Sequence, residues 1–120
     1  MRMTEMDLDG QNPIEGYGPG GFRVASDWHE GSMLLMPSEI LPLSPPLSLE
    51  ALRPVLSAPD PVDVLLVGMG PDIVPLPREI RAALEEAWIG VEIMSTPAAC
   101  RTYNVLLVEA RRVAAALIAI

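Results

Sequence analysis

The stretch Val64-Leu65-Leu66-Val67-Gly68-Met69-Gly70 decides the fold of this chain. Its first four residues carry no polar side chain, and such a run is typical of a strand that is covered on both faces in a parallel sheet. Two glycines follow at once, so the backbone of the next loop can approach a neighbour or a ligand closely. The stretch therefore predicts a buried strand with a glycine-rich loop at its carboxyl end.

Downstream of this strand, a helix is expected from Arg78 to about Trp88, because Pro77 favours the first position of a helix. Gly90 is expected to cap its end, and a strand is expected over 91–94. The apolar residues of the helix recur at helical spacing and predict a buried stripe. They are Ile80, Leu84, Ala87 and Trp88.

A second helix is expected to begin at Thr96-Pro97, with Thr96 as its N-cap. Its end is ambiguous, since the many alanines favour one long helix through 105–118. Val113, Ala115 and Leu117 also allow the helix to stop near Ala110 and a last strand to follow. Periodicity does not decide between these two interpretations.

Upstream, the pattern over 22–36 predicts a β-hairpin, with Glu30-Gly31-Ser32 as its turn. A short strand over 40–43 and a helix after the N-cap Ser48 are expected next, and Pro54 should kink or shorten that helix. The order strand, helix, strand, helix then predicts an α/β sandwich with a mainly parallel sheet. The 120 residues suit one domain. We expect a flexible acidic tail over 1–13 and a single α/β domain over 14–120.

Composition excludes several classes of function. The chain has a net charge of −8, and its eight basic residues are all Arg, which argues against binding nucleic acid or anionic lipid by charge. One Cys and one His argue against a disulfide framework and most metal sites, and we expect neither a metal nor a cofactor. An acidic N-terminal stretch and the lack of an apolar run of ~20 residues predict a cytoplasmic protein without a transmembrane segment.

Two loops are candidates for binding a ligand. Gly68 and Gly70 follow one strand, while the second helix begins after the next strand, so its free amides and dipole favour an anion. If the two strands are adjacent, the loops share a crevice at one edge of the sheet. The candidate ligand residues are Gly68, Gly70, Thr96, Ala99, Cys100 and Arg101. The alternative is a tight loop and a capped, closely packed helix.

Cys100 is the chain's one candidate nucleophile. A helix N-terminus can lower a thiol pKa, but no base stands near Cys100 in the sequence, since His29 lies about seventy residues upstream. We therefore expect a buried, inert thiol. The absence of a nucleophile–base pair leaves enzymatic activity uncertain and favours a protein without catalysis.

The sequence resembles a small family of unknown biochemical activity that includes the mitochondrial respiratory complex I assembly factor 3 and short bacterial and archaeal proteins. The resemblance covers about residues 14–118 and is carried by four stretches of sequence and by the segment 113–118. These stretches are Gly16-Tyr17-Gly18 with Gly21-Phe22-Arg23-Val24, His29-Glu30-Gly31-Ser32, Leu65 to Gly70, and Val91-Glu92-Ile93-Met94-Ser95-Thr96-Pro97-Ala98-Ala99-Cys100-Arg101-Thr102-Tyr103-Asn104.

This resemblance implies a three-layer α/β sandwich with a central mixed, mainly parallel sheet whose last strand runs antiparallel, and the hairpin predicted over 22–36 adds an N-terminal β-hairpin layer. It also implies a helix to about Glu109 and a last strand from about Arg112 to Ile118. Ala110 stands where the family often has Gly, so the turn between them is expected to be less regular.

The resemblance further implies a non-catalytic protein-interaction domain, an assembly or maturation factor for a respiratory membrane complex. Its partners would be complex subunits or other assembly factors, reached at the inner face of a bacterial membrane. We expect a monomer or a small homodimer. The candidate interaction residues are Thr102, Tyr103, Asn104, Arg111 and Arg112. The alternative is a binding protein or enzyme for an anionic small molecule held between Gly68–Gly70 and Thr96–Arg101.

Overall fold

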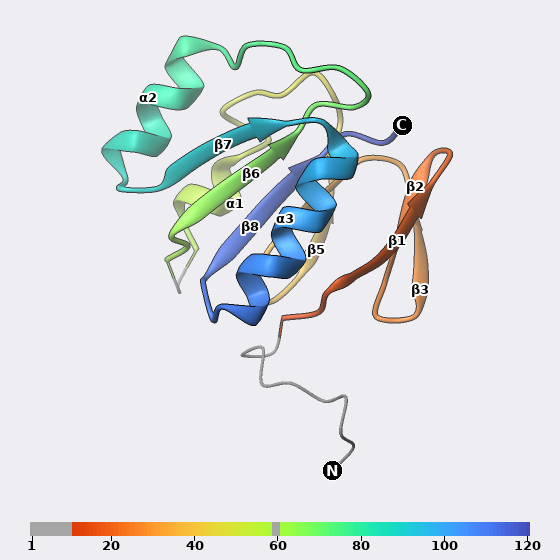
Figure 1. Ribbon diagram of the computed structural model, residues 1–120. Helices are drawn as coiled ribbons and strands as arrows, with labels where there is room; N and C mark the ends of the chain where they lie inside the picture. Colours follow the sequence, from red (N-terminus) through yellow and green to blue (C-terminus); the bar gives the residue numbers. More distant parts are fainter. Residues whose placement is uncertain (1–10, 59–60) are drawn as a thin grey trace.

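The computed structural model describes residues 11–58 and 61–120 (Figure 1). These residues form a three-stranded sheet and a five-stranded sheet, with helices on both faces of the larger one. The elements are β1 (Ile14–Gly18), β2 (Gly21–Val24), β3 (Asp27–Glu30), β4 (Met33–Leu35), β5 (Ile40–Pro42), α1 (Arg53–Leu56), β6 (Val64–Gly68), α2 (Arg78–Glu86), β7 (Gly90–Met94), α3 (Thr96–Val108) and β8 (Val113–Leu117).

The larger sheet is mixed, with the strand order β5-β4-β8-β6-β7. β6 pairs in parallel with β7 and with β8, whereas β4 pairs antiparallel with β5 and with β8. The mixed sheet is therefore confirmed, but the last strand runs parallel to β6 and is antiparallel only to β4. The reason is the crossover through α3, which returns the chain to the amino end of the sheet before β8 begins.

The three layers are built on two hydrophobic cores. Leu65 and Val67 of β6 face one core together with α1 and α2, while Val64 and Leu66 face the other core together with α3. Figure 1 shows α3 in front of the sheet and α1 behind it. β6 is thus covered on both faces, as its uninterrupted apolar run predicts.

The expected hairpin over 22–36 is wrong in its pairing. β2 pairs with β3 and not with β4, because Ala25 and Ser26 both adopt left-handed backbone angles, with φ of 53° and 69°, and turn the chain directly after Val24. β4 instead joins the larger sheet beside β8. All three of its residues are buried, which suits a strand inside that sheet.

The side chain of Asn104 on α3 binds the small sheet through two hydrogen bonds. The N–H of Ile14 donates to Oδ1 of Asn104 at 2.8 Å, and Nδ2 of Asn104 donates to the carbonyl of Ile14 at 2.8 Å. Gln11, which the sequence assigns to the tail, is buried and its Nε2 donates to the Tyr103 hydroxyl at 3.1 Å. The packed part of the chain therefore includes Gln11. Residues 1–10 of the expected tail lie outside the described residues.

The helices end differently from expectation. α2 stops at Glu86, so Trp88 leaves the buried stripe and takes a left-handed φ of 62°, while Gly90 begins β7. The N–H groups of Trp88 and Ile89 donate to carbonyls of the last helical turn, which closes the helix at Trp88 instead of Gly90. Among the described residues, no helix is long and apolar enough to span a membrane.

Candidate functional site

The two loops singled out by the sequence lie side by side at one edge of the sheet. Gly68 at the end of β6 is in register with Met94 at the end of β7. The N–H of Met69 donates to the carbonyl of Met94 at 2.9 Å, and the N–H of Thr96 donates to the carbonyl of Gly70 at 2.9 Å. The expected adjacency is therefore confirmed, and the two loops are joined by backbone hydrogen bonds.

The Thr96 side chain closes the space between these loops. Its hydroxyl accepts from the N–H of Gly70 at 2.8 Å and donates to the carbonyl of Ile118 at 2.7 Å, and the residue has no exposed surface. The one proton of this hydroxyl is therefore already used. Thr96 ties the β6 loop, the start of α3 and the chain after β8 together.

Gly68 permits this close approach. A Cβ atom at this position would lie 2.9 Å from Cα and 3.0 Å from Oγ1 of Thr96, and 3.1 Å from Cδ2 of Leu117. Gly70 has a φ of 95°, which a side chain rarely tolerates. Both glycines thus have a packing reason that needs no ligand.

The start of α3 differs from expectation by one residue. Ser95 is the N-cap, and its Oγ accepts from the N–H of Ala98 at 3.4 Å, so Thr96 already belongs to the helix. Ala99 is fully buried, while Arg101 is exposed. Of the candidate ligand residues on α3, Arg101 is the one that faces solvent.

Cys100 is only 4% exposed. Burial raises the pKa of its thiol to about 11, and the neighbouring Arg101 charge opposes this effect in part. Desolvation thus outweighs any lowering of the thiol pKa by the helix dipole. The thiol is protonated near pH 7, which supports the expectation of an inert side chain.

Tyr103 and Asn104, two of the candidate interaction residues, contact the N-terminal segment. Tyr103 is fully buried, and burial raises the pKa of its hydroxyl to about 12, although the hydrogen bond with Gln11 acts in the opposite direction. Asn104 holds Ile14, as described above, while Thr102 is half-buried. In this stretch, Thr102 is the residue that retains surface without binding the N-terminal segment.

Arg111 and Arg112 lie between α3 and β8. Arg111 is exposed and Arg112 is half-buried. The carbonyl of Arg112 accepts from the N–H of Asp63 at 2.7 Å, and its N–H donates to Oδ2 of Asp63 at 3.3 Å. Arg112 therefore helps to fix the amino end of β6, and Arg111 presents its charge to solvent.

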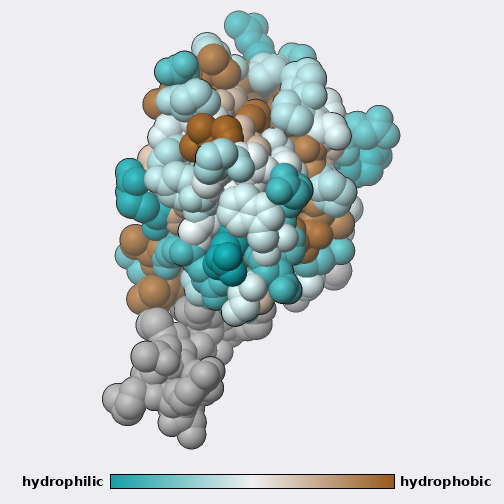
Figure 2. All heavy atoms as spheres, turned by 90° about the vertical axis from the view of Figure 1, so that its right-hand side faces the viewer, coloured by the Kyte–Doolittle hydropathy of each residue, from teal (hydrophilic) through white to brown (hydrophobic). Residues whose placement is uncertain are grey.

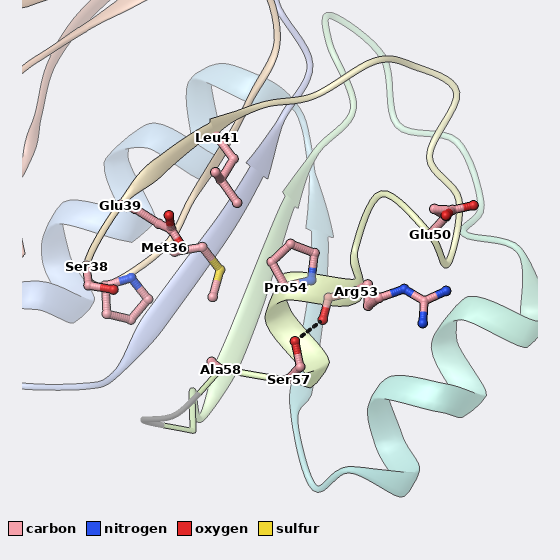
Figure 3. Close-up of a pocket in the computed structure, with 10 residues that line it drawn as sticks. Met36, Ser38, Glu39, Leu41, Glu50, Arg53, Pro54, Ser57 and Ala58 are labelled. Carbon is pink, nitrogen blue, oxygen red and sulfur yellow. Dashed lines mark hydrogen bonds between the residues drawn. The ribbon is translucent and has the colours of Figure 1, made fainter.

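Sequence reasoning missed a hollow of about 420 Å³ on the opposite face of the sheet from α3. Figure 3 shows that its walls come from the turn between β4 and β5 on one side and from α1 and the residues after it on the other. The hollow joins segments that no single motif connects, so no sequence signal could have revealed it. Its lining residues are Met36, Pro37, Ser38, Glu39, Leu41, Glu50, Arg53, Pro54, Ser57 and Ala58.

Sequence reasoning also misplaced Trp88, which is 91% exposed and the most exposed large hydrophobic side chain in the described part of the chain. Its spacing from Leu84 predicts burial, but the helix ends two residues too early. Figure 2 shows a different face, the one that carries the small sheet, where hydrophobic side chains form separate patches among hydrophilic ones. On this face (Figure 2) the exposed apolar surface is therefore divided and does not form one broad patch.

The chain forms a small three-layer α/β fold in which Thr96 fills the space between the two loops at the carboxyl ends of β6 and β7. What remains accessible to a ligand or a partner is its outer surface and the open hollow behind the sheet. The chain belongs to the family described as a protein of unknown function (DUF498/DUF598), whose profile matches residues 14–118. An uncharacterized protein of Rhodobacter capsulatus is 44% identical over 98% of this chain and 93% of its own length.

Animal proteins also match. The protein of Danio rerio named NADH dehydrogenase [ubiquinone] 1 alpha subcomplex assembly factor 3 is 33% identical over 88% of this chain. The match covers 63% of that protein, and the proteins of the same name from Xenopus tropicalis and Drosophila melanogaster are covered to 60% and 61%. The chain therefore spans less than two thirds of the length of these assembly factors.

Solved structures share the fold. The crystal structure of a protein from Bartonella henselae, titled an outer membrane protein, is similar with a TM-score of 0.86 at 44% identity, over 92% of this chain and 96% of that chain. The solution structure of a Bordetella pertussis protein described as an Mth938-like domain has a TM-score of 0.74 at 26% identity, over 98% and 92% of the two chains. The fold is thus that of the Mth938-like proteins.

Proposed function

We propose that this chain is a non-catalytic protein-interaction domain that acts as an assembly or maturation factor for a respiratory membrane complex. The observation that carries the proposal is the closed edge of the sheet, where Thr96 and the amide of Gly70 use their hydrogen bonds inside the chain. Cys100, the candidate nucleophile on α3, is buried and protonated near pH 7. The matches to three assembly factors supply the class of process.

The partners in this proposal are other proteins, either subunits of the respiratory complex or further assembly factors. The chain would meet them on the cytoplasmic side of a bacterial membrane, as a monomer or a small homodimer. Arg101, Thr102, Arg111 and Arg112 are proposed contacts, because they keep exposed or half-exposed surface near the two ends of α3. The adjacent Arg111 and Arg112 form a cationic spot on a chain of net charge −8, which favours an acidic partner surface at that turn.

Replacement of the Rhodobacter capsulatus relative by this chain tests the assembly role. We expect loss of the relative to reduce the amount of intact NADH:ubiquinone oxidoreductase in membranes, and expression of this chain to restore it. Native gels of solubilised membranes measure the intact complex and its subassemblies. An unchanged complex in the strain that lacks the relative would contradict the proposal.

The alternative is an anionic small molecule bound between Gly68–Gly70 and Thr96–Arg101. It is favoured by the confirmed adjacency of the two loops and by the exposed Arg101. A screen of anionic metabolites for an increase in melting temperature tests it, with Arg101→Ala expected to abolish any such increase. If no metabolite raises the melting temperature, this alternative is removed.

A further inference from the structure

Among residues 11–58 and 61–120, no strand pairs with the outer edge of β7. β7 is the last strand in the order β5-β4-β8-β6-β7, so one of its edges faces no other strand of the sheet (Figure 1). The N–H of Gly90 donates to the carbonyl of Asp63, and the carbonyl of Met94 accepts from Met69, so the backbone groups of these two residues point toward β6. Because successive residues alternate, those of Val91 and Ile93 point outward.

The opposite edge of the sheet lacks these features. β5 has only three residues, and its last residue, Pro42, has no N–H to donate. Natural sheets commonly protect an edge in this way, with a short strand and a proline. β7 has five residues and no proline, so of the two edge strands it offers the longer row of backbone groups, while α2 packs against the face of β7 that carries Val91 and Ile93.

Trp88 lies two residues before β7 and independently favours a partner at this edge of the sheet. It occupies a left-handed position that favours glycine, with a φ of 62°, and its indole is 91% exposed. The left-handed backbone conformation costs stability in the isolated chain, and the exposed side chain gains almost nothing from burial there. Tryptophan is also the residue type most enriched among those that dominate binding energy at protein interfaces. Trp88 is therefore suited to contact a partner that lies along β7.

Glu92 disfavours a symmetric pairing with a second copy of this chain and favours a different protein. It is the central residue of β7 and is exposed. If two copies paired antiparallel with their β7 strands centred on each other, Glu92 would face Glu92 of the other copy, and like charges directly opposite are destabilising. A cationic residue on a different chain would face the same carboxylate favourably.

We propose that β7 accepts an added strand from a partner protein, whose segment is extended, carries a Lys or Arg opposite Glu92 and places an apolar side chain against Trp88. This inference rests on the proposed function and identifies the docking edge and the chemistry of the partner. The main-chain bonds to Val91 and Ile93 supply affinity, and the charge opposite Glu92 supplies selectivity.

Two capped peptides test the charge requirement: Ser-Thr-Val-Lys-Val-Thr-Ser-Leu, whose Leu lies near Trp88 when Lys lies opposite Glu92 in an antiparallel pairing, and the same peptide with Glu in place of Lys. We expect the protein to bind the Lys peptide about five- to tenfold more tightly than the Glu peptide, because an attractive cross-strand pair is replaced by a repulsive one. Glu92→Lys should reverse this preference. Glu109→Lys, which changes the net charge equally at the end of α3, should leave it as in the wild type. Equal binding of both peptides, or binding of neither, would overturn the proposal.

Amide hydrogen exchange tests the backbone contacts directly. We expect the amides of Val91 and Ile93 to exchange fast in the free protein and at least tenfold more slowly with the Lys peptide bound, while the amide of Glu92, which faces β6, stays slow in both. If Val91 and Ile93 are slow in the free protein only at high protein concentration, the occupant is a second copy, and the proposal is wrong. Protection of both amides at all concentrations would also overturn it.

A backbone variant separates this inference from the proposed function. Val91→Pro removes an outward N–H and should abolish binding of the Lys peptide, whereas Val91→Ala keeps that N–H and should bind it. If a partner co-purifies with the tagged chain and both Val91→Pro and Glu92→Lys leave its recovery unchanged, β7 is not the docking edge, although the proposed function stands. If the peptide binds as expected and no partner co-purifies, the edge is supported and the proposed function fails.

Discussion

The buried side chain of Thr96 makes its hydrogen bonds entirely within the chain. The hydroxyl connects the amide of Gly70 to the carbonyl of Ile118, and the residue is completely buried. Removal of the hydroxyl leaves a buried amide and a partly buried carbonyl without this partner. A residue that sequence reasoning assigned to ligand binding therefore has a structural role that accounts for all its contacts.

Thr96→Val is expected to lower the free energy of unfolding by roughly 2–3 kcal/mol, because the N–H of Gly70 and the carbonyl of Ile118 lose their shared partner. Urea unfolding followed by circular dichroism measures this change. Thr96→Ser keeps the hydroxyl and should cost clearly less. Equal losses in the two variants would show that the methyl group, and not the hydrogen bonds, carries the effect.

Cys100 predicts a loss of stability at high pH. Its thiol pKa is raised from 9.0 to about 11 by burial, so the unfolded chain loses this proton first as the pH rises above 9. The contribution of the protonated thiol to the free energy of unfolding is complete below pH 9 and falls as the pH rises toward 11. At pH 10.5 it has fallen by roughly 2 kcal/mol. Tyr103 acts in the same direction at higher pH, because its pKa is raised from 10.0 to about 12.

Urea unfolding of the wild type and of Cys100→Ala at pH 8 and pH 10.5 measures this contribution. We expect the wild type to lose more stability between the two pH values than Cys100→Ala loses. The same pH dependence in both chains would mean that the thiol ionises as freely in the folded protein as in the unfolded one.

At the scale of the residue, the sequence predicted which loops meet but not what fills the space between them. The adjacency of Gly68 and Thr96 follows from two parallel strands that are neighbours in the sheet. The closure depends on a hydroxyl that reaches Ile118, 22 residues further along the chain. Local patterns carry no signal for such a contact.

At the scale of the element, both longer helices end with a residue other than glycine in a left-handed conformation. Trp88 follows α2 and Ala110 follows α3, each with a φ of 62°. After α3, the N–H groups of Ala110 and Arg111 donate to the carbonyls of Leu107 and Leu106 at 2.9 and 3.0 Å. The hydrogen bonds of a regular helix end are thus present without the glycine that usually makes them easy.

Ala110→Gly is expected to raise the free energy of unfolding by up to about 1 kcal/mol, since glycine adopts this backbone conformation without a Cβ penalty. Thermal unfolding by calorimetry measures the gain. Ala82→Gly, at an exposed position inside α2, should instead lose about 1 kcal/mol. A loss at position 110 as large as that at position 82 would refute the assignment of strain to Ala110.

Elements with strong periodic patterns were predicted well, and their connections less so. The strands over 64–67 and 91–94 and the helix after Pro77 follow from apolar patterns and proline positions. The pairing of β2 failed because Ala25 and Ser26 are unusual residues for a tight left-handed turn. The predicted burial of Trp88 was wrong because α2 ends two residues earlier than expected, which leaves this position exposed.

At the scale of the whole molecule, the small sheet depends on α3 for its position. Asn104 makes two hydrogen bonds to Ile14, and Tyr103 contributes to the core that the small sheet shares with the larger one. The sequence predicted a separate N-terminal layer but placed Asn104 on the surface. Its pairing with a residue 90 positions away explains why it was not recognised as structural.

Asn104→Ala is expected to lower the free energy of unfolding by roughly 1–3 kcal/mol and to speed amide exchange in β1. After correction for the change in global stability, amide exchange in β6 should be as slow as in the wild type, because β6 lies in the larger sheet. Asn12→Ala, at an exposed position beside the small sheet, is the matched control. Uniform acceleration across both sheets in proportion to stability would mean that they open as one unit.

Isolation of the tagged chain from gently solubilised membranes tests the central claim, that this domain acts by holding another protein. We expect one or a few proteins to be recovered in a fixed ratio to the chain, by the wild type and by Cys100→Ala alike. Trp88→Gly, which relieves backbone strain and removes the exposed indole, should recover less partner although it is at least as stable. Recovery of the wild-type chain alone, with the native mass of the free 12.9 kDa protein or of its homodimer, would contradict the account.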